Sequence, residues 1–186
     1  MPKQKVDADT IIQRALHLFK TQGYHATSMA DLGEACGLLK GSIYHYFSSK
    51  EALALAVMDY VQSYFASQVF SFADDASLPP AERMKRLNQA SENYFLGQDG
   101  GCLMGNLALE VVNVMPQFKS AIEQYFNDWA AALCRILLSR YPEKEAASLS
   151  WQAVAEIQGG IMMMRLYGKA DYFLAANRKL EAKLAK

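Results

Sequence analysis

The chain has 186 residues, 52% of them hydrophobic, and its 19 basic residues balance 19 acidic ones. This length predicts one domain, or a small domain joined to a larger one. The apolar share is sufficient for a packed core and excludes a disordered chain. The net charge of zero gives no general attraction to nucleic acid, although the first 50 residues hold a small basic excess and all three histidines.

Several classes of protein are disfavoured by simple patterns. The first ten residues contain no apolar signal-peptide core, and no run of about 18 apolar residues predicts a membrane span. Cys36, Cys102 and Cys134 lie far apart and show neither a CxxC nor a zinc spacing. We therefore expect a cytoplasmic protein with free thiols, no bound metal or cofactor, and no membrane partner.

Helical periodicity dominates the first 50 residues. Residues 7–23 place apolar side chains on one face and end at a glycine. Ser28 and Asp31 have the spacing of a capping box, which predicts the start of a second helix that ends at Gly37. A third, short helix is expected to begin near Leu39 or Lys40.

The rest of the chain is also predicted to be helical, with eight or nine helices in all and no sheet. The expected helices cover about 50–72, 80–96, 102–114, 117–140, 145–167 and 170–186. Breaks between them are indicated by proline, glycine and short polar segments. The sequence therefore predicts an all-α protein.

Three short helices, the second and third joined by a glycine-containing turn, describe a helix-turn-helix, whose last helix enters the major groove of DNA. On the third helix, Ile43 and Phe47 are four residues apart and are expected to face inward. Polar side chains remain on the other side, where lysine and serine can bond bases or phosphates. We therefore expect this segment to contact DNA.

The segment ATSMADLGEACGLLKGSIYHYFSSKEAL resembles the N-terminal module of TetR-type transcriptional repressors. The resemblance covers about residues 8–57 and includes a Gly-Tyr pair, Thr-Ser, Lys-Gly-Ser, Ile-Tyr and Ser-Lys-Glu in register. It implies a helix-turn-helix DNA-binding domain at 1–50 and a helical ligand-binding and dimerisation domain at 51–186. The expected partner is then a double-stranded, palindromic DNA operator.

The resemblance also implies roles for single residues of the module. The positions that match base-facing positions of the family are Lys40, Gly41, Ser42 and Tyr44. The positions that match contacts to the sugar-phosphate backbone are Thr27, Ser28, His45, Tyr46 and Lys50. Leu39 departs from the pattern, because a small polar residue often starts this helix.

A single module of this size reads few bases, so a homodimer is expected to supply a second half-site. The helices at about 117–140 and 145–167 are the predicted interface, in agreement with the family; the alternative is that they are core helices of a monomer. The interface residues predicted are Phe118, Ile122, Tyr125, Trp129, Gly159 and Gly160.

The resemblance further implies a cavity for a small-molecule inducer in the second domain. The candidate lining residues are Tyr64, Phe65, Phe95, Cys102, Met104, Asn106, Leu107, Met162, Met163, Arg165, Leu166 and Tyr167. The three adjacent methionines offer a deformable apolar surface, and ordinary packing is the alternative for them.

The segment GGCLMGNLALEV is similar to one branch of the family, some members of which use a cysteine there to sense electrophiles or oxidants. Backbone donors at a helix start would favour the Cys102 thiolate; the alternative is a small buried packing residue.

The leading hypothesis is a repressor released from its operator by a small apolar or reactive ligand. The alternatives are a thiol sensor acting through Cys102 and a non-regulatory helical DNA-binding protein. An enzyme is disfavoured, because no histidine has a catalytic or metal-binding spacing.

Overall fold

A computed structural model describes residues 6–113 and 115–185. Residues 1–5, Val114 and Lys186 lie outside this range. The expected lack of a signal peptide concerns residues 1–10 and so falls partly outside it, and Val114 is the expected end of one helix. Within the described residues the fold is all-α, as predicted, with nine α-helices, one 3-10 helix and no strand. The helices are α1 (Ala8–Thr21), α2 (Met29–Ala35), α3 (Lys40–Ile43), α4 (Lys50–Gln68), η1 (Phe70–Asp74, 3-10), α5 (Pro80–Leu96), α6 (Leu103–Glu110), α7 (Pro116–Leu137), α8 (Glu143–Tyr167) and α9 (Asp171–Ala182). Among the described residues, no helix is both long enough and apolar enough to cross a membrane.

The chain forms two compact units that do not coincide with a division after residue 50. Unit 1 comprises the described residues of Met1–Val61 together with Leu103–Ile122, and unit 2 comprises Gln62–Cys102 and Glu123–Lys186. Helix α6 and the start of α7 therefore belong to the same unit as the three N-terminal helices.

Unit 1 is built on helix caps that the sequence encodes. The Asp7 carboxylate accepts a hydrogen bond from the Thr10 N–H at 2.9 Å and begins α1. The predicted capping box of α2 is confirmed: Ser28 Oγ accepts from the Asp31 N–H at 3.2 Å, and the Ser28 N–H donates to Asp31 Oδ2 at 2.7 Å. The caps of α1 and α2 satisfy backbone groups that a helix end leaves without partners.

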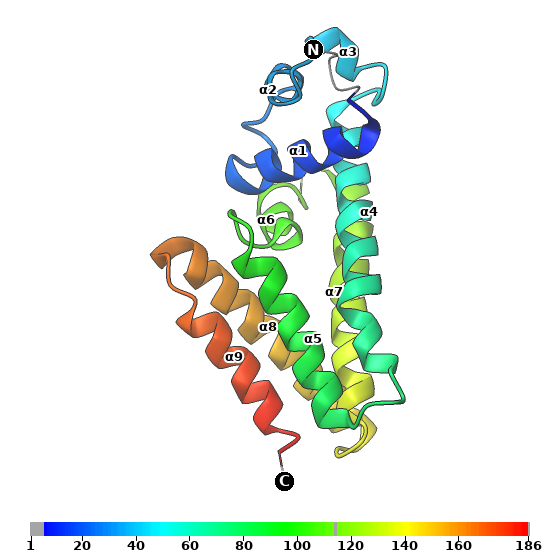
Figure 1. The fold of residues 1–186 in the computed structure, drawn as a ribbon, viewed down its shortest axis with the longest axis vertical. Coiled ribbons are helices and arrows are strands. Elements are labelled where there is room, and N and C mark those ends of the chain that lie inside the picture. The colour runs from blue at the N-terminus through cyan, green and yellow to red at the C-terminus, as the bar shows by residue number, and fades with distance from the viewer. Residues whose placement is uncertain (1–5, 114, 186) are drawn as a thin grey trace. The chain divides into compact units, whose positions relative to one another are not determined.

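Figure 1 shows α2 and α3 as neighbouring short helices, with α6 beside α1.

The helix expected to reach residue 72 ends earlier, because α4 stops at Gln68 and η1 follows. Two serine hydroxyls donate to main-chain carbonyls here, Ser67 to Ser63 O at 2.8 Å and Ser71 to Ser67 O at 2.7 Å. Such bonds to the preceding turn weaken and bend a helix. The tighter 3-10 turn also buries Phe70, whose ring centroid lies 5.6 Å from that of Phe65.

Unit 2 has an aromatic core. Phe65 is fully buried, with ring centroids of Tyr94 at 4.8 Å and Tyr125 at 5.2 Å. Trp129 stacks on Phe95 with an interplanar angle of 13°. Edge-to-face and stacked rings of this kind add to the stabilisation from burial alone.

Helices α8 and α9 run side by side in unit 2 (Figure 1). Their contact depends on Gly160, where an added Cβ would lie 2.6 Å from the Phe173 Cα. Gly159 faces open space instead, because an added Cβ there has no neighbour within 4 Å.

These observations correct the predicted interface. Phe118, Ile122, Tyr125 and Trp129 are at most 4% exposed and pack inside the single chain, so they cannot meet a partner in this conformation. Their stretch of α7 is apolar on more than one side because it is surrounded by its own chain. Gly160 is likewise occupied by the backbone of α9.

Candidate nucleic-acid interface and ligand cavity

The recognition segment is α3 with the turn that follows it. Ile43 is fully buried and fixes the segment to unit 1, as expected. The side chains of Lys40, Tyr44 and His45 are exposed, and Tyr44 is 45% exposed. Gly41 is exposed as well, and Ser42 is half-buried. The structure thus brings the predicted base-facing residues together on a short polar surface.

Three of the residues predicted to contact the DNA backbone use their hydroxyl groups for hydrogen bonds within the chain. Thr27 is fully buried, and its hydroxyl donates to the Gly23 carbonyl at 2.7 Å, so this residue holds a turn and cannot reach a phosphate. The Tyr46 hydroxyl donates to the Val6 carbonyl at 2.8 Å. Ser28 stays exposed, although its Oγ is engaged in the capping box.

Lys50 is also tied to the module. Its ammonium donates to the carbonyls of Tyr24 and Thr27, both at 3.0 Å, and lies 4.3 Å from the centre of the Tyr24 ring. An ammonium has three donors, so two of them are used on the turn between α1 and α2. In this structure Lys50 stabilises the turn, and its predicted contact to the sugar-phosphate backbone stays a prediction.

The same turn is bound from another side by Glu110, at the end of α6. Its carboxylate accepts the Tyr24 N–H at 2.9 Å and the His25 N–H at 2.6 Å. Gly23 makes this approach possible: its φ is +91°, and an added Cβ would lie 3.2 Å from Glu110 Oε2. We call this pair of hydrogen bonds the Glu110 clasp. The sequence did not predict this contact, because Glu110 is 86 positions from Tyr24 and 85 from His25, and no local pattern links residues so far apart.

Tyr24 lies at the centre of this arrangement. It is 2% exposed and packs against Phe19 and Phe118, with ring centroids at 5.6 and 5.4 Å. Burial, followed by the nearby Glu51 and Glu110 carboxylates, raises the pKa of the Tyr24 phenol to about 12. The ring therefore stays neutral and anchors the turn by packing.

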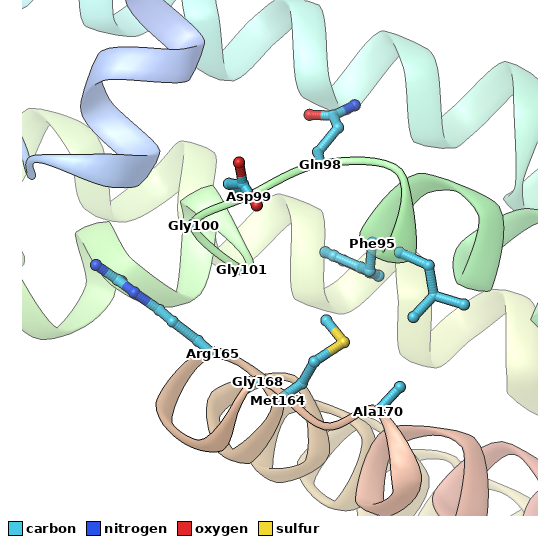
Figure 2. A pocket seen from close by; sticks show the side chains of 10 residues that line it. Phe95, Gln98, Asp99, Gly100, Gly101, Met164, Arg165, Gly168 and Ala170 are labelled. Atoms are coloured by element: carbon cyan, nitrogen blue, oxygen red, sulfur yellow. The ribbon is translucent and has the colours of Figure 1, made fainter.

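Unit 2 contains a cavity of about 360 Å³. Its lining consists of Phe95, Leu96, Gln98, Asp99, Gly100, Gly101, Met164, Arg165, Gly168 and Ala170. Figure 2 shows the loop 98–101 on one side of the cavity and the end of α8 on the other, with Met164 extending toward Phe95. This size is within the range of small-molecule sites, and the lining combines apolar groups with a few polar ones.

Of the predicted ligand-binding residues, only Phe95 and Arg165 line this cavity. Met162, Leu166 and Tyr167 are more than half exposed, and Met163 lines a different, apolar groove between α8 and α9. Tyr64 and Phe65 belong to the aromatic core. Met104 and Leu107 are buried in unit 1, where the Asn106 amide donates to the Lys20 carbonyl at 3.4 Å. The loop 98–101 was not predicted to line a cavity, because it contains no large apolar side chain.

Cys102 is 5% exposed and follows directly on this loop. It contributes to the raised pKa of Tyr125, although burial is the larger cause. Cys36 is half-buried, and burial raises the pKa of its thiol. Neither environment provides the exposed, electropositive setting of a reactive thiolate.

Comparison with known proteins assigns both parts of the chain to one family. Residues 11–57 match the model of the bacterial regulatory proteins of the tetR family. Residues 80–179 match the model of the C-terminal domain of LmrA/YxaF-like transcriptional regulators. The chain belongs to the TetR family of transcriptional regulators.

Relatives in the TetR family span most of the chain. The uncharacterised regulator YxaF of Bacillus subtilis is 29% identical over 159 residues, which cover 83% of each protein. The transcriptional repressor DhaR of a Mycobacterium species is 29% identical over 119 residues, or 64% of this chain and 59% of DhaR. A TetR regulator of known structure from Legionella pneumophila has a TM-score of 0.85 at 22% identity, covering 97% of this chain and 98% of its own. TetR regulators act by binding DNA and are not enzymes.

The Glu110 clasp gives a direct prediction for stability. Glu110→Ala leaves two backbone N–H groups without their acceptor and should lower the free energy of unfolding by about 1–3 kcal/mol. Glu110→Gln keeps one acceptor oxygen and should lose less. Urea denaturation followed by circular dichroism measures both.

Glu34→Ala is the matched control, because this exposed glutamate of α2 lies in the same unit. It should change the free energy of unfolding by less than about 0.5 kcal/mol. Equal stability of Glu110→Ala and the parent protein would contradict a stabilising role of the clasp.

Proposed function

We propose that this protein is a repressor that binds a palindromic operator through α3 and is released by a small apolar molecule. The observation that carries the proposal is the set of exposed Lys40, Tyr44 and His45 and half-buried Ser42, on α3 and the turn after it. Buried Ile43 fixes the inner side of this segment. Lysine and serine can bond base edges, and a tyrosine ring can contact a thymine methyl group. The relative DhaR is named a transcriptional repressor, which supports repression rather than activation.

Mutation of the exposed set tests DNA recognition. Lys40→Ala and Tyr44→Ala should each weaken binding to a selected operator by about 1–3 kcal/mol, because each removes a base contact. Affinity of the parent protein should also fall as salt rises, because phosphate contacts release counterions. Fluorescence anisotropy measures both effects: the variants are compared at one fixed salt concentration, and the parent protein is titrated at a series of salt concentrations.

Lys144→Ala removes the same charge from an exposed site on α8 and should leave affinity unchanged. Unchanged affinity of both Lys40→Ala and Tyr44→Ala would contradict the proposed reading surface.

We also propose that the protein acts as a homodimer through α8 and α9, the face that remains after the correction of the α7 residues. Trp151, Met162 and Leu166 are 48%, 53% and 69% exposed. Their spacing of eleven and four residues places them on one side of α8. Tyr172 of α9 is 61% exposed, and an apolar groove lies between the two helices. Exposed apolar surface of this extent is typical of an interface.

A charge on this face should separate the subunits. Leu166→Glu is expected to shift the mass in sedimentation equilibrium from two chains to one, because an unpaired carboxylate cannot be buried in an apolar interface. Leu138→Glu, at a residue 48% exposed beyond the end of α7, should leave the mass unchanged. A parent protein with the mass of one chain at micromolar concentration would contradict the dimer.

The inducer site we propose is the cavity of unit 2. Its loop 98–101 is continuous along the chain with α6, which ends in the Glu110 clasp. A ligand that displaces this loop would also displace α6. The displacement of α6 would alter the hydrogen bonds of Glu110 to the turn that supports α2 and α3. Coupling of this kind requires only that the ligand binds one of two arrangements better than the other.

Filling the cavity should block release without affecting DNA binding. Ala170→Phe places a ring in the lining, so it should abolish the release that apolar aromatic compounds cause in the parent protein while operator affinity stays unchanged. Lys169→Phe, at the neighbouring position outside the lining, should still be released. Full release of Ala170→Phe would exclude this cavity as the inducer site.

The thiol alternative depends on Cys102. Its burial argues against direct attack by an oxidant, since the reactive species is an accessible thiolate. Loss of peroxide-induced release in Cys102→Ser would restore this alternative.

A further inference from the structure

Leu39 stands out among the exposed residues of the DNA-reading module. It is 82% exposed, while the preceding Leu38 is half-buried and its N–H donates to the Gly33 carbonyl at 2.8 Å. The turn between α2 and α3 therefore places one leucine against the module and the other in solvent.

Leucine at this position is unfavourable for the free protein in two ways. Its side chain gains nothing from burial, and it occupies the N-cap of α3, where the structure shows no side-chain hydrogen bond to the helix. Serine, threonine, aspartate or asparagine would supply that bond. Residues that break a local rule without a gain in the folded state occur preferentially at functional sites.

The position of Leu39 indicates which partner it meets. It directly precedes Lys40, and the exposed Tyr44 lies one further turn along the same segment. Lys40 and Tyr44 belong to the surface proposed to enter the major groove, and Leu39 adjoins it in the chain with its side chain in solvent. Of the base edges in the major groove, thymine presents a methyl group, with which apolar side chains make contact.

We propose that Leu39 contacts the 5-methyl group of a thymine in each operator half-site and thereby selects that base pair. This inference rests on the proposed binding of DNA through α3. It explains why an apolar residue replaces the small polar residue common at this position in the family. An apolar contact to the sugar-phosphate backbone is the competing explanation, and it would carry no dependence on sequence.

Replacement of thymine by deoxyuridine tests the contact, because it removes the methyl group and leaves the base pairing intact. The operator is first selected from random DNA, and each thymine of one half-site is then replaced in turn. For the parent protein, one replacement should weaken binding about fourfold, the value expected for one buried methyl or methylene group.

In Leu39→Ser the effect of that replacement should vanish, so that the thymine and deoxyuridine operators bind equally. Serine can cap α3, so loss of folding is not expected from this variant. Leu39→Met, which keeps an apolar side chain, should retain the preference. Leu109→Ser is the matched control, because Leu109 of α6 is 87% exposed but lies outside the helix-turn-helix, and it should retain the full effect.

Three results would overturn the inference. The first is a selected half-site without thymine, and the second is the absence of any position sensitive to deoxyuridine. The third is a sensitivity that persists unchanged in Leu39→Ser. In all three the protein still binds a specific operator, so the proposed function stands; a failure to bind any DNA sequence selectively would instead remove both proposals.

Discussion

The turn between α1 and α2 is held by two opposite charges, and the reading surface depends on this arrangement. The Glu110 carboxylate accepts the N–H groups of Tyr24 and His25, while the Lys50 ammonium donates to the carbonyls of Tyr24 and Thr27. Helix α3 has only four residues, too few to be stable alone, so its position is set by the packing of the segments around it. Fixing the turn at Tyr24 fixes the start of α2, and α2 in turn positions α3 through their shared turn.

This arrangement also suggests how regulation reaches the DNA-binding surface. Lys50 is the first residue of α4 and Glu110 is the last residue of α6, so the start of one helix and the end of the other bind the same turn. In our proposal, a change at the loop 98–101 is transmitted along α6, whose eight residues form a short rigid element. Interfaces and packed cores switch between discrete arrangements, which allows a small shift at a ligand site to have a large effect. Hydrogen bonds to a charged carboxylate are strong enough to matter in that balance.

Local features of the molecule were predictable from the sequence. The Ser28–Asp31 capping box, the inward Ile43 and the exposed Lys40 and Tyr44 follow from short-range rules of helix capping and periodicity. Roles that depend on distant partners were not predictable in the same way. Family resemblance assigned Lys50 to phosphate, but its two carbonyl partners are supplied by a turn more than twenty residues away.

The α7 aromatic residues show the same limit on a larger scale. Periodicity indicates that a helix has more than one apolar face, but it does not say whether its own chain or a second copy covers that face. Tyr125 and Trp129 prove to be covered by Phe65, Phe70 and Phe95 of the same chain. An exposed apolar stripe lies on α8, and another side of the same helix packs against α9 at Gly160.

Amide hydrogen exchange at Tyr24 and His25 tests the central claim most directly, because these two N–H groups are the donors of the Glu110 clasp. Nuclear magnetic resonance would follow their exchange with the protein bound to its operator and again after release by an inducer. We predict slow exchange of both amides on the operator and a clear acceleration after release, while amides of the α8–α9 contact stay protected. Equal exchange of Tyr24 and His25 in the two states would contradict the coupling of ligand binding to DNA recognition through this turn.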